Sequence, residues 1–409
     1  VRSRVHFAPK VWLRLVMELQ DNIDRELNNA MSNGVAPGAV AIVVNKNQTL
    51  YEKSFGLQSL RTQSPMAIDS IFNIASMTKP VAALGCMRAV EQGLLDLDQN
   101  AGELIPWLDE VQVLDGFTSS GKPIMRNAHT HITLRKLLTH TSGFVYEVWN
   151  SNQNKFLQLA GPEIASNGAI ASLEQPLAFE PGEKWGYGPG IDWATRLLEA
   201  ATNQPLSKYL EAEIFKPLGM SDTSFEPIRV GEEKFGRRAA LHRATSHGYK
   251  TMKDGTLDRA SSREFDGGGG GLYSTAADYG KFMQLLLNEG NFEGKNILSR
   301  ETVKLMSGNQ IGALRVPQMR STNYFLSADT DFLPGIEKSW GLSFLINEEN
   351  NPGGRDKGSL SWAGLCNTYF WIDPTNEIAA ALLFQLLPFA HPPVIELLSR
   401  FEKAIYKNL

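Results

Sequence analysis

The chain has 409 residues, 42% of them hydrophobic, and a formal net charge of −4. This length is sufficient for a large core and for two lobes. The mildly acidic balance, without basic runs, argues against nucleic acid as a partner. No apolar run approaches about 18 residues, so the sequence predicts no segment that crosses a membrane.

The cysteines and the first residues bear on the compartment. Cys86 and Cys366 are too few for a disulfide framework or a metal cluster, and they suit a reducing compartment. Residues 1–6 are basic, but no apolar core with a small-residue cleavage site follows them, and Met17 could be an internal start. We therefore expect a cytoplasmic protein.

The N-terminal part predicts a helix and then a hairpin. Apolar residues recur at three- and four-residue steps from about residue 10 to residue 32, which indicates an amphipathic helix that ends at Gly34. Residues 39–44 predict a buried strand, and residues 49–56 return as its partner. A hairpin that begins a sheet favours antiparallel pairing.

A serine and a lysine open the next apolar, helix-favouring stretch. If Ser76 begins that helix, Lys79 lies on the same face one turn later. The helix N-terminus beside them is electropositive and presents free N–H groups. A nucleophilic serine needs such a proton acceptor and such donors for the anion that it forms. A serine at this position is also a common helix cap, so the pattern alone leaves both interpretations open.

The middle of the chain is mostly helical and rich in loops. The apolar pattern and the glycine and proline breaks predict helices at residues 132–143, 191–200 and 206–214.

A run of five glycines, residues 267–271, follows Asp266. No Gly-Lys-Ser/Thr follows the run, which argues against a phosphate-binding loop and favours a tight packing turn. Ser274 or Thr275 then caps a helix that runs to Leu287. The tail predicts strands at residues 340–346, 358–364, 368–372 and 378–385, and a closing helix at residues 394–406.

Strands therefore occur at both ends of the chain, with helices between them. This order predicts an α+β fold, in which a mainly antiparallel sheet is flanked by terminal helices and a mostly helical lobe is inserted. We assign residues 1–82 and 240–409 to the α/β lobe and residues 83–239 to the inserted lobe. Sites commonly lie between lobes, and Ser76 is near the first crossing.

Five motifs stand in a characteristic order along most of the chain. They are Ser76-Met77-Thr78-Lys79, the Leu-Leu-Thr-His-Thr-Ser-Gly of residues 137–143, Tyr187, the glycine run with residues 272–278, and Trp362-Ala363-Gly364. In this order the sequence resembles the class C side of the serine beta-lactamase-related superfamily, and within it the family VIII carboxylesterases and the related statin-precursor acyltransferases. The resemblance implies the beta-lactamase and penicillin-binding-like fold.

The resemblance also implies roles for the matching positions. Ser76 is the expected nucleophile, and Lys79 and Tyr187 are expected to share the role of its base. For this role the pKa of Lys79, ordinarily about 10.4, must be lowered by burial and by a nearby positive field. The backbone N–H groups of Ser76 and Leu365 are expected to form the oxyanion hole.

Two departures from the pattern of related beta-lactamases favour an ester substrate. Pro189 stands in the place of an asparagine and cannot donate to a substrate amide. Trp362 replaces a lysine, so no charge at this position holds a carboxylate, and its ring offers an apolar wall. Gly364 lets a substrate pass close to the strand. We expect substrate contacts from Trp362, Ala363, Gly364, Tyr146 and Pro189.

Other candidate sites are less well supported. There is no G-x-S-x-G elbow and no H-E-x-x-H in the sequence. A metal site at His129, His131 and His140 is disfavoured because their context matches a structural segment of the family. Cys86 is expected to be buried and Cys366 to lie near the site. Six aromatic residues of the middle lobe could line a pocket, although core packing is favoured for most of them: Trp107, Phe144, Tyr146, Trp149, Trp185 and Trp193.

The expected function is that of a serine carboxylesterase that hydrolyses short- to medium-chain acyl esters through an acyl-enzyme at Ser76. Acyl transfer to an alcohol acceptor, weak beta-lactamase or D-aminopeptidase activity, and a non-catalytic ligand-binding role remain alternatives. We expect a small-molecule ester as the partner, without a cofactor, a metal, nucleic acid or a membrane.

Overall fold

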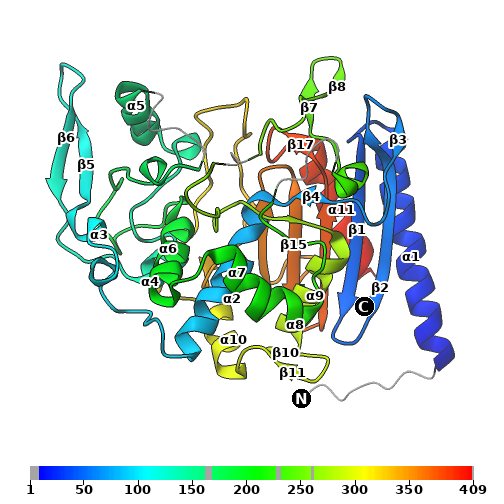
Figure 1. Cartoon of the computed structure of the whole chain (residues 1–409). Helices are drawn as coiled ribbons and strands as arrows, with labels where there is room; N and C mark the ends of the chain where they lie inside the picture. The colour runs from blue at the N-terminus through cyan, green and yellow to red at the C-terminus, as the bar shows by residue number, and fades with distance from the viewer. Residues whose placement is uncertain (1–8, 162–167, 227–231, 259–261, 408–409) are drawn as a thin grey trace.

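The computed structural model describes residues 9–161, 168–226, 232–258 and 262–407. Its centre is an eight-stranded sheet whose order is β12-β13-β14-β15-β16-β1-β2-β3 (Figure 1). Strands from the two ends of the chain meet where β1 pairs with β16, antiparallel. The strands are β1 (Gly38–Asn45), β2 (Thr49–Ser59), β3 (Ser64–Pro65), β12 (Lys338–Trp340), β13 (Leu345–Asn347), β14 (Leu360–Gly364), β15 (Thr368–Asp373) and β16 (Ile378–Leu383).

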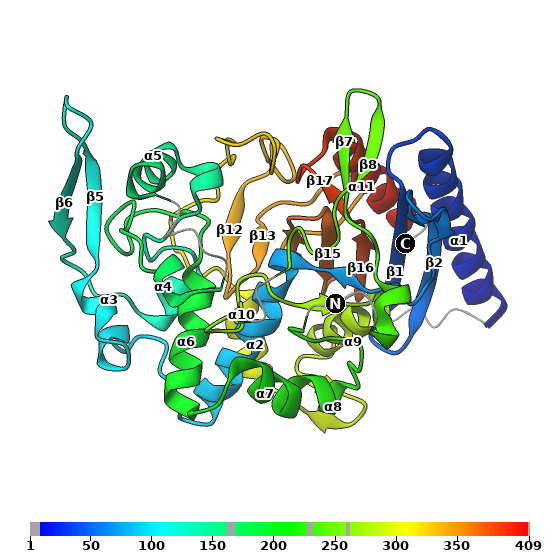
Figure 2. The same ribbon diagram turned by 45° about the horizontal axis from the view of Figure 1, so that its top comes forward.

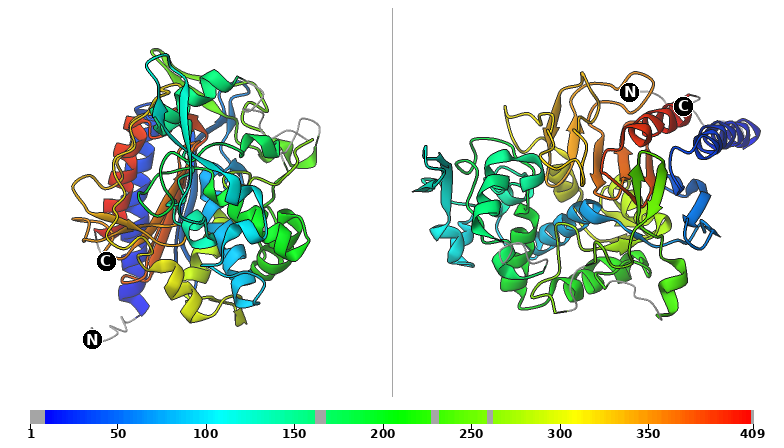
Figure 3. Two further views of the ribbon diagram at one scale, coloured as in Figure 1. Left: turned by 90° about the vertical axis from the view of Figure 1, so that its left-hand side faces the viewer. Right: turned by 90° about the horizontal axis from the view of Figure 1, so that it is seen from above.

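Two terminal helices, α1 (Pro9–Ser32) and α11 (Pro392–Tyr406), cover one face of the sheet, as Figure 3 shows from the side. Alternate residues of β1 divide between the two faces because side chains of a strand point to opposite sides. Ala41 packs with the α1 and α11 residues, whereas Ile42 packs into the larger core on the other face. The sheet is thus buried on both faces, which explains the continuous apolar run in this strand.

Helices α2 (Thr78–Glu91) and α9 (Ala276–Leu287) pack on the second face. The side chain of Thr275 accepts a hydrogen bond from the backbone N–H of Asp278 at 3.2 Å and so caps α9 as predicted. Gly280 lets α9 approach the sheet, since a Cβ there would lie 2.8 Å from Ile42 Cδ1. This close contact fixes α9 directly over β1.

The elements between α2 and α9 lie mostly beside the large sheet, and the β5–β6 hairpin is at the far end from α1 (Figure 2). The assignment of residues 83–239 to a separate lobe stays a prediction, and its first boundary falls within α2. The elements are α3 (Trp107–Glu110), β5 (Gln112–Phe117), β6 (Pro123–Asn127), α4 (Leu134–Leu138), α5 (Ser151–Ala160), α6 (Gly190–Thr202), α7 (Leu206–Leu210), α8 (Lys216–Leu218), β7 (His242–Thr245), β8 (Gly248–Thr251) and β9 (Tyr273–Ser274).

The structure confirms most of the predicted elements and corrects four. The helix expected at residues 206–214 is α7 only as far as Leu210, and a π-helix, Glu211–Phe215, follows it. The helix expected at residues 132–143 ends at Leu138, because His140 has a left-handed backbone with φ 58°. The strand expected at residues 340–346 is two strands, separated by a turn in which Ser343 has φ 76°. The β5–β6 hairpin was not predicted in the helical region.

None of the helices in the described part of the chain is long and apolar enough to cross a lipid bilayer.

Candidate active site

A strained turn presents Ser76. β4 (Phe72–Asn73) is followed by a 3-10 turn, Ala75–Met77, which leads directly into α2. Ala75 has a left-handed backbone with φ 42°, and its N–H donates to Asn73 Oδ1 at 2.9 Å. A non-glycine residue in this conformation costs free energy and marks a place where the fold imposes a geometry. The turn brings Ser76 to the wall of a cavity.

Lys79 is completely buried below Ser76. Its Nζ donates to Ser76 Oγ at 3.1 Å, to the Tyr146 hydroxyl at 3.1 Å and to the Gly269 carbonyl oxygen at 2.5 Å. An ammonium group has three N–H donors, and these three acceptors satisfy all of them. The predicted contact between Lys79 and Ser76 is present in the structure.

Two tyrosines enclose the lysine. The Nζ of Lys79 lies 4.8 Å from the ring centroid of Tyr187 and 5.1 Å from that of Tyr146. The Tyr187 hydroxyl accepts a hydrogen bond from Trp362 Nε1 at 3.0 Å. The N–H of Tyr146 donates to the Tyr187 carbonyl oxygen at 2.9 Å, which holds the two residues side by side. Ser76, Lys79 and Tyr187 are therefore brought together, while their catalytic roles stay predictions.

The electrostatic environment of Lys79 differs from the expectation. Burial lowers the pKa of Lys79, but Tyr146, Tyr187 and the Asp192 carboxylate raise it, and the net pKa lies above its ordinary value. The expected lowering of this pKa is wrong for this arrangement, because the two tyrosines and the Asp192 carboxylate around Lys79 outweigh the effect of burial. Burial raises the pKa of the Tyr146 hydroxyl, so it is neutral beside the charged lysine.

The glycine run forms the tight turn that was predicted, and this turn also connects Asp192 to Lys79. The N–H of Gly269 donates to Asp192 Oδ1 at 2.9 Å, and the Gly269 carbonyl accepts from Lys79. A Cβ on Gly269 would lie 2.2 Å from Asp192 Oδ2. Only glycine fits between the carboxylate and the lysine at this position.

Replacing Asp192 with asparagine is expected to shift the pH dependence of the reaction. Asparagine keeps an oxygen for the Gly269 N–H and removes the negative charge that raises the pKa of Lys79. If neutral Lys79 takes the Ser76 proton, the rate rises with pH through the Lys79 pKa. The rising limb of the kcat/KM profile should therefore move to lower pH in Asp192→Asn. An unmoved limb would exclude Lys79 as the group that titrates there.

Gly364 and Leu365 lie at the end of β14, next to the turn that carries Ser76. A Cβ on Gly364 would lie 2.2 Å from the Ile74 carbonyl oxygen and 2.3 Å from Thr368 Oγ1. The close approach that requires this glycine is thus made by the protein's own backbone. Leu365 and Ser76 both line the cavity, and an oxyanion hole formed by their N–H groups stays a prediction.

We expect Gly364→Ala to inactivate the enzyme although the side chains of Ser76, Lys79 and Tyr187 are all retained. The added methyl group must push the Ile74 carbonyl away and displace the turn of Ser76. A displacement of about 1 Å lowers kcat/KM by about 100-fold. Gly236→Ala is the matched control, since a Cβ there meets open space. Equal activity of the two variants would show that the contact with Ile74 does not position the serine.

The cavity above Ser76 has a volume of about 420 Å³. Six other predicted site residues line it: Tyr146, Tyr187, Pro189, Trp362, Ala363 and Leu365. Gly364 does not line it, so its contact with substrate stays a prediction. Trp149 also lines the cavity, whereas Phe144, Trp185 and Trp193 are buried in the core, as expected for most of these aromatic residues. Cys86 is buried as predicted, and Cys366 lines a neighbouring cavity.

Sequence reasoning missed three partners of the lysine. From the sequence, Tyr146 is predicted to bind substrate, Asp192 is one residue of the helix predicted at 191–200, and residues 267–271 predict a packing turn. Gly269 is 190 positions from Lys79 in the sequence and Tyr146 is 67 positions from it. The one available signal was the glycine run, because five glycines in a row indicate that something must approach the backbone closely.

The fold and the site define a class of enzyme. A serine at the start of a buried helix, bonded to a buried lysine and facing an antiparallel sheet, is the arrangement of serine acyl-transfer enzymes. The chain belongs to the beta-lactamase family, because the family model described as Beta-lactamase matches residues 23–402. It is an acyl-transfer enzyme of the beta-lactamase and penicillin-binding-like fold.

Similar proteins include transferases and an esterase of fungi. The chain is 30% identical over 385 residues to the ML-236A carboxylate methylbutanoyltransferase of Penicillium citrinum. The matched residues cover 91% of each of the two chains. It is 29% identical over 399 residues to the lovastatin esterase of Penicillium rubens, covering 94% of this chain and 98% of the esterase. A mutant simvastatin synthase of Aspergillus terreus has a similar structure, with a TM-score of 0.81, 29% identity and 99% coverage of both chains.

Proposed function

We propose that the chain is a serine carboxylesterase that hydrolyses short- to medium-chain acyl esters. The observation that carries this proposal is the 3.1 Å contact between Lys79 Nζ and Ser76 Oγ at the wall of a cavity of about 420 Å³. Trp362 contributes an apolar wall to this cavity in place of a cation. The site therefore suits a neutral ester better than a substrate that carries a carboxylate at that position.

The proposed reaction proceeds through an acyl-enzyme. Ser76 Oγ attacks the ester carbonyl, its proton passes to neutral Lys79 and from there through Tyr187 to the leaving alcohol, and the N–H groups of Ser76 and Leu365 bind the oxyanion. The alcohol then leaves with this proton, and water releases the acid and restores Ser76. Because the pKa of Lys79 is raised, only the neutral fraction of Lys79 works as a base, and this fraction grows with pH.

Transfer of the acyl group to an alcohol is the second candidate. Two observations favour it: a relative at 30% identity is named as a methylbutanoyltransferase, and the cavity is large enough to hold an acceptor beside a short acyl group. The two reactions share the acyl-enzyme and differ only in whether water or an alcohol attacks it. The cytoplasmic location and the small-molecule partner stay predictions.

Product analysis separates the two functions. The enzyme is incubated with p-nitrophenyl butyrate alone and with a series of alcohols, and p-nitrophenol, butyric acid and the new ester are measured. Butyric acid as the main product at every alcohol concentration supports hydrolysis. A new ester that replaces the acid at low alcohol concentration supports transfer. No release of p-nitrophenol above the background would contradict both.

A further inference from the structure

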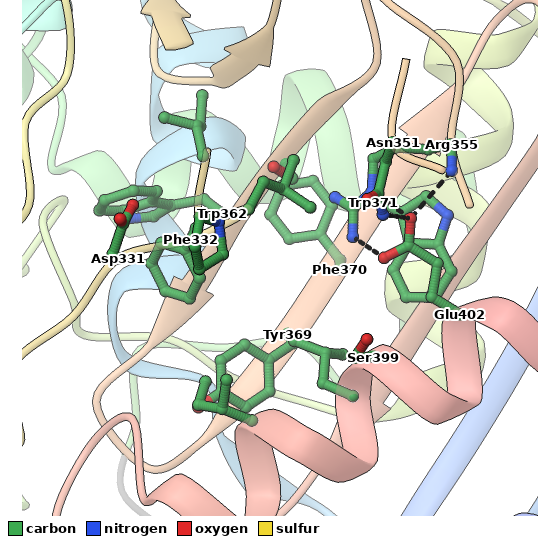
Figure 4. A pocket seen from close by; sticks show the side chains of 16 residues that line it. Asp331, Phe332, Asn351, Arg355, Trp362, Tyr369, Phe370, Trp371, Ser399 and Glu402 are labelled. Carbon is green, nitrogen blue, oxygen red and sulfur yellow. Dashed lines mark hydrogen bonds and ion pairs between the residues drawn. The ribbon is translucent and has the colours of Figure 1, made fainter. Parts of the chain in front are cut away.

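A second cavity lies between β14, β15 and α11, on the face of the sheet that the terminal helices cover (Figure 4). Its volume is about 140 Å³. In Figure 4, Phe332 and Trp362 stand at one end, and Arg355 and Glu402 stand at the other. We call this space the back cavity. Near Phe332 most of the side chains that line the back cavity are apolar, so this end suits a hydrocarbon group.

Two aromatic rings separate the back cavity from the active-site cavity. Trp362 lines both cavities. Phe332 lines the back cavity, and its ring lies 5.6 Å from that of Trp362 and 6.1 Å from that of Phe389, which lines the active-site cavity. On the other side the Phe332 ring lies 6.3 Å from Tyr369, a wall of the back cavity. The ring of Phe332 therefore forms a partition between the back cavity and the active-site cavity.

The segment around Phe332 is held at its flanks by polar contacts in addition to the packing of the ring. The buried Lys338 Nζ donates to Asp331 Oδ1 at 2.8 Å and to the Leu333 carbonyl oxygen at 3.3 Å. Leu333 has a left-handed backbone with φ 54°, which is costly for a branched side chain. The Phe332 side chain is only half-buried. Shortening this side chain removes its ring contacts but leaves the Lys338 contacts that anchor the segment on both sides.

The far end of the back cavity is closed to charged groups. Arg355 Nε and Nη2 donate to the two carboxylate oxygens of Glu402 at 2.9 and 2.8 Å. Asn351 Nδ2 donates to the same carboxylate at 2.9 Å. Because both charges are paired with each other, this end offers no free charge to a substrate. An uncharged alkyl chain is the ligand class that fits the back cavity.

We infer that Phe332 sets the longest acyl chain that the enzyme accepts, by separating the active-site cavity from the back cavity. This inference rests on the proposed acyl-enzyme at Ser76. In the wild-type chain the acyl group is confined to the active-site cavity, and removal of the Phe332 ring joins the two spaces beside Trp362. A longer linear acyl chain can then extend past the partition and bury its end between β15 and α11.

The test compares acyl chain lengths in the full-length wild type, in Phe332→Ala and in the double variant Phe332→Ala/Ser399→Phe. Values of kcat/KM are measured for p-nitrophenyl esters from acetate to decanoate. Relative to its own rate with acetate, Phe332→Ala should gain about fourfold for each further methylene that enters the back cavity, whereas the wild type should not. Ser399 lines the back cavity from α11, so a phenylalanine there should fill it and restore the wild-type profile.

Two measurements distinguish the possible failures. Intact-mass analysis with a short-chain and a long-chain alkyl fluorophosphonate reports labelling of Ser76 independently of turnover. If neither probe labels the wild type, the proposed acyl-enzyme is wrong and this inference falls with it. If the short probe labels all variants and Phe332→Ala has the wild-type length profile, only the inference is overturned. Phe325→Ala is the control, since this exposed ring lines neither cavity.

Discussion

Replacement of Ser76 by alanine is expected to abolish covalent labelling and nearly all ester turnover. The Ser76 hydroxyl is the only predicted nucleophile at the cavity wall, and it is the one that Lys79 contacts at 3.1 Å. Loss of a catalytic serine of this kind lowers kcat by roughly 10⁴- to 10⁶-fold. The measurement is intact-mass analysis after brief incubation with an ester panel, combined with the rate of p-nitrophenol release.

The control for this prediction is Ser246→Ala, which removes a hydroxyl from the exposed turn between β7 and β8. It should label and turn over like the wild type. The fold of Ser76→Ala should be unchanged, because the substitution removes one oxygen and leaves the 3-10 turn and α2 intact. Turnover by Ser76→Ala at the wild-type rate would exclude the acyl-enzyme mechanism altogether.

Removal of the Tyr187 hydroxyl is the second change with a large expected effect. Tyr187 covers Lys79 with its ring and receives a hydrogen bond from Trp362 Nε1, so its oxygen is held in place beside the cavity. A group that carries protons in the transition state contributes about 10²- to 10⁴-fold. We therefore expect Tyr187→Phe to lower kcat by this factor while the KM changes little.

Tyr146→Phe is the matched comparison, because its hydroxyl is the one that contacts Lys79 directly, at 3.1 Å. If Tyr146 only supports the lysine, its loss should cost about tenfold, the value of one hydrogen bond to a charged group. The ratio of the losses in kcat caused by Tyr187→Phe and Tyr146→Phe shows which tyrosine carries the proton. A larger loss in Tyr146→Phe than in Tyr187→Phe would move that role to Tyr146.

Local patterns in the sequence determined much of this protein. The three-residue spacing of Ser76 and Lys79 places them on one helix face, and the structure has their side chains in contact. The helix at residues 10–32, the first hairpin and the capped α9 followed from periodicity and from single capping residues. These features depend on neighbours within a few positions, and such neighbours can be identified in a sequence without knowledge of the fold.

The tertiary structure alone decided what surrounds the lysine. The Gly269 carbonyl and the Asp192 carboxylate reach Lys79 because the glycine turn packs against α6, and Trp362 reaches the Tyr187 hydroxyl across 175 positions. Although burial lowers the pKa of Lys79, Tyr146, Tyr187 and Asp192 around it raise this pKa above its ordinary value, against the expectation from the sequence. The partition at Phe332 also arises only when a loop, two strands and α11 meet. Long-range packing determines how deeply Lys79 is buried and which charged groups surround it, and no local sequence pattern encodes these two properties.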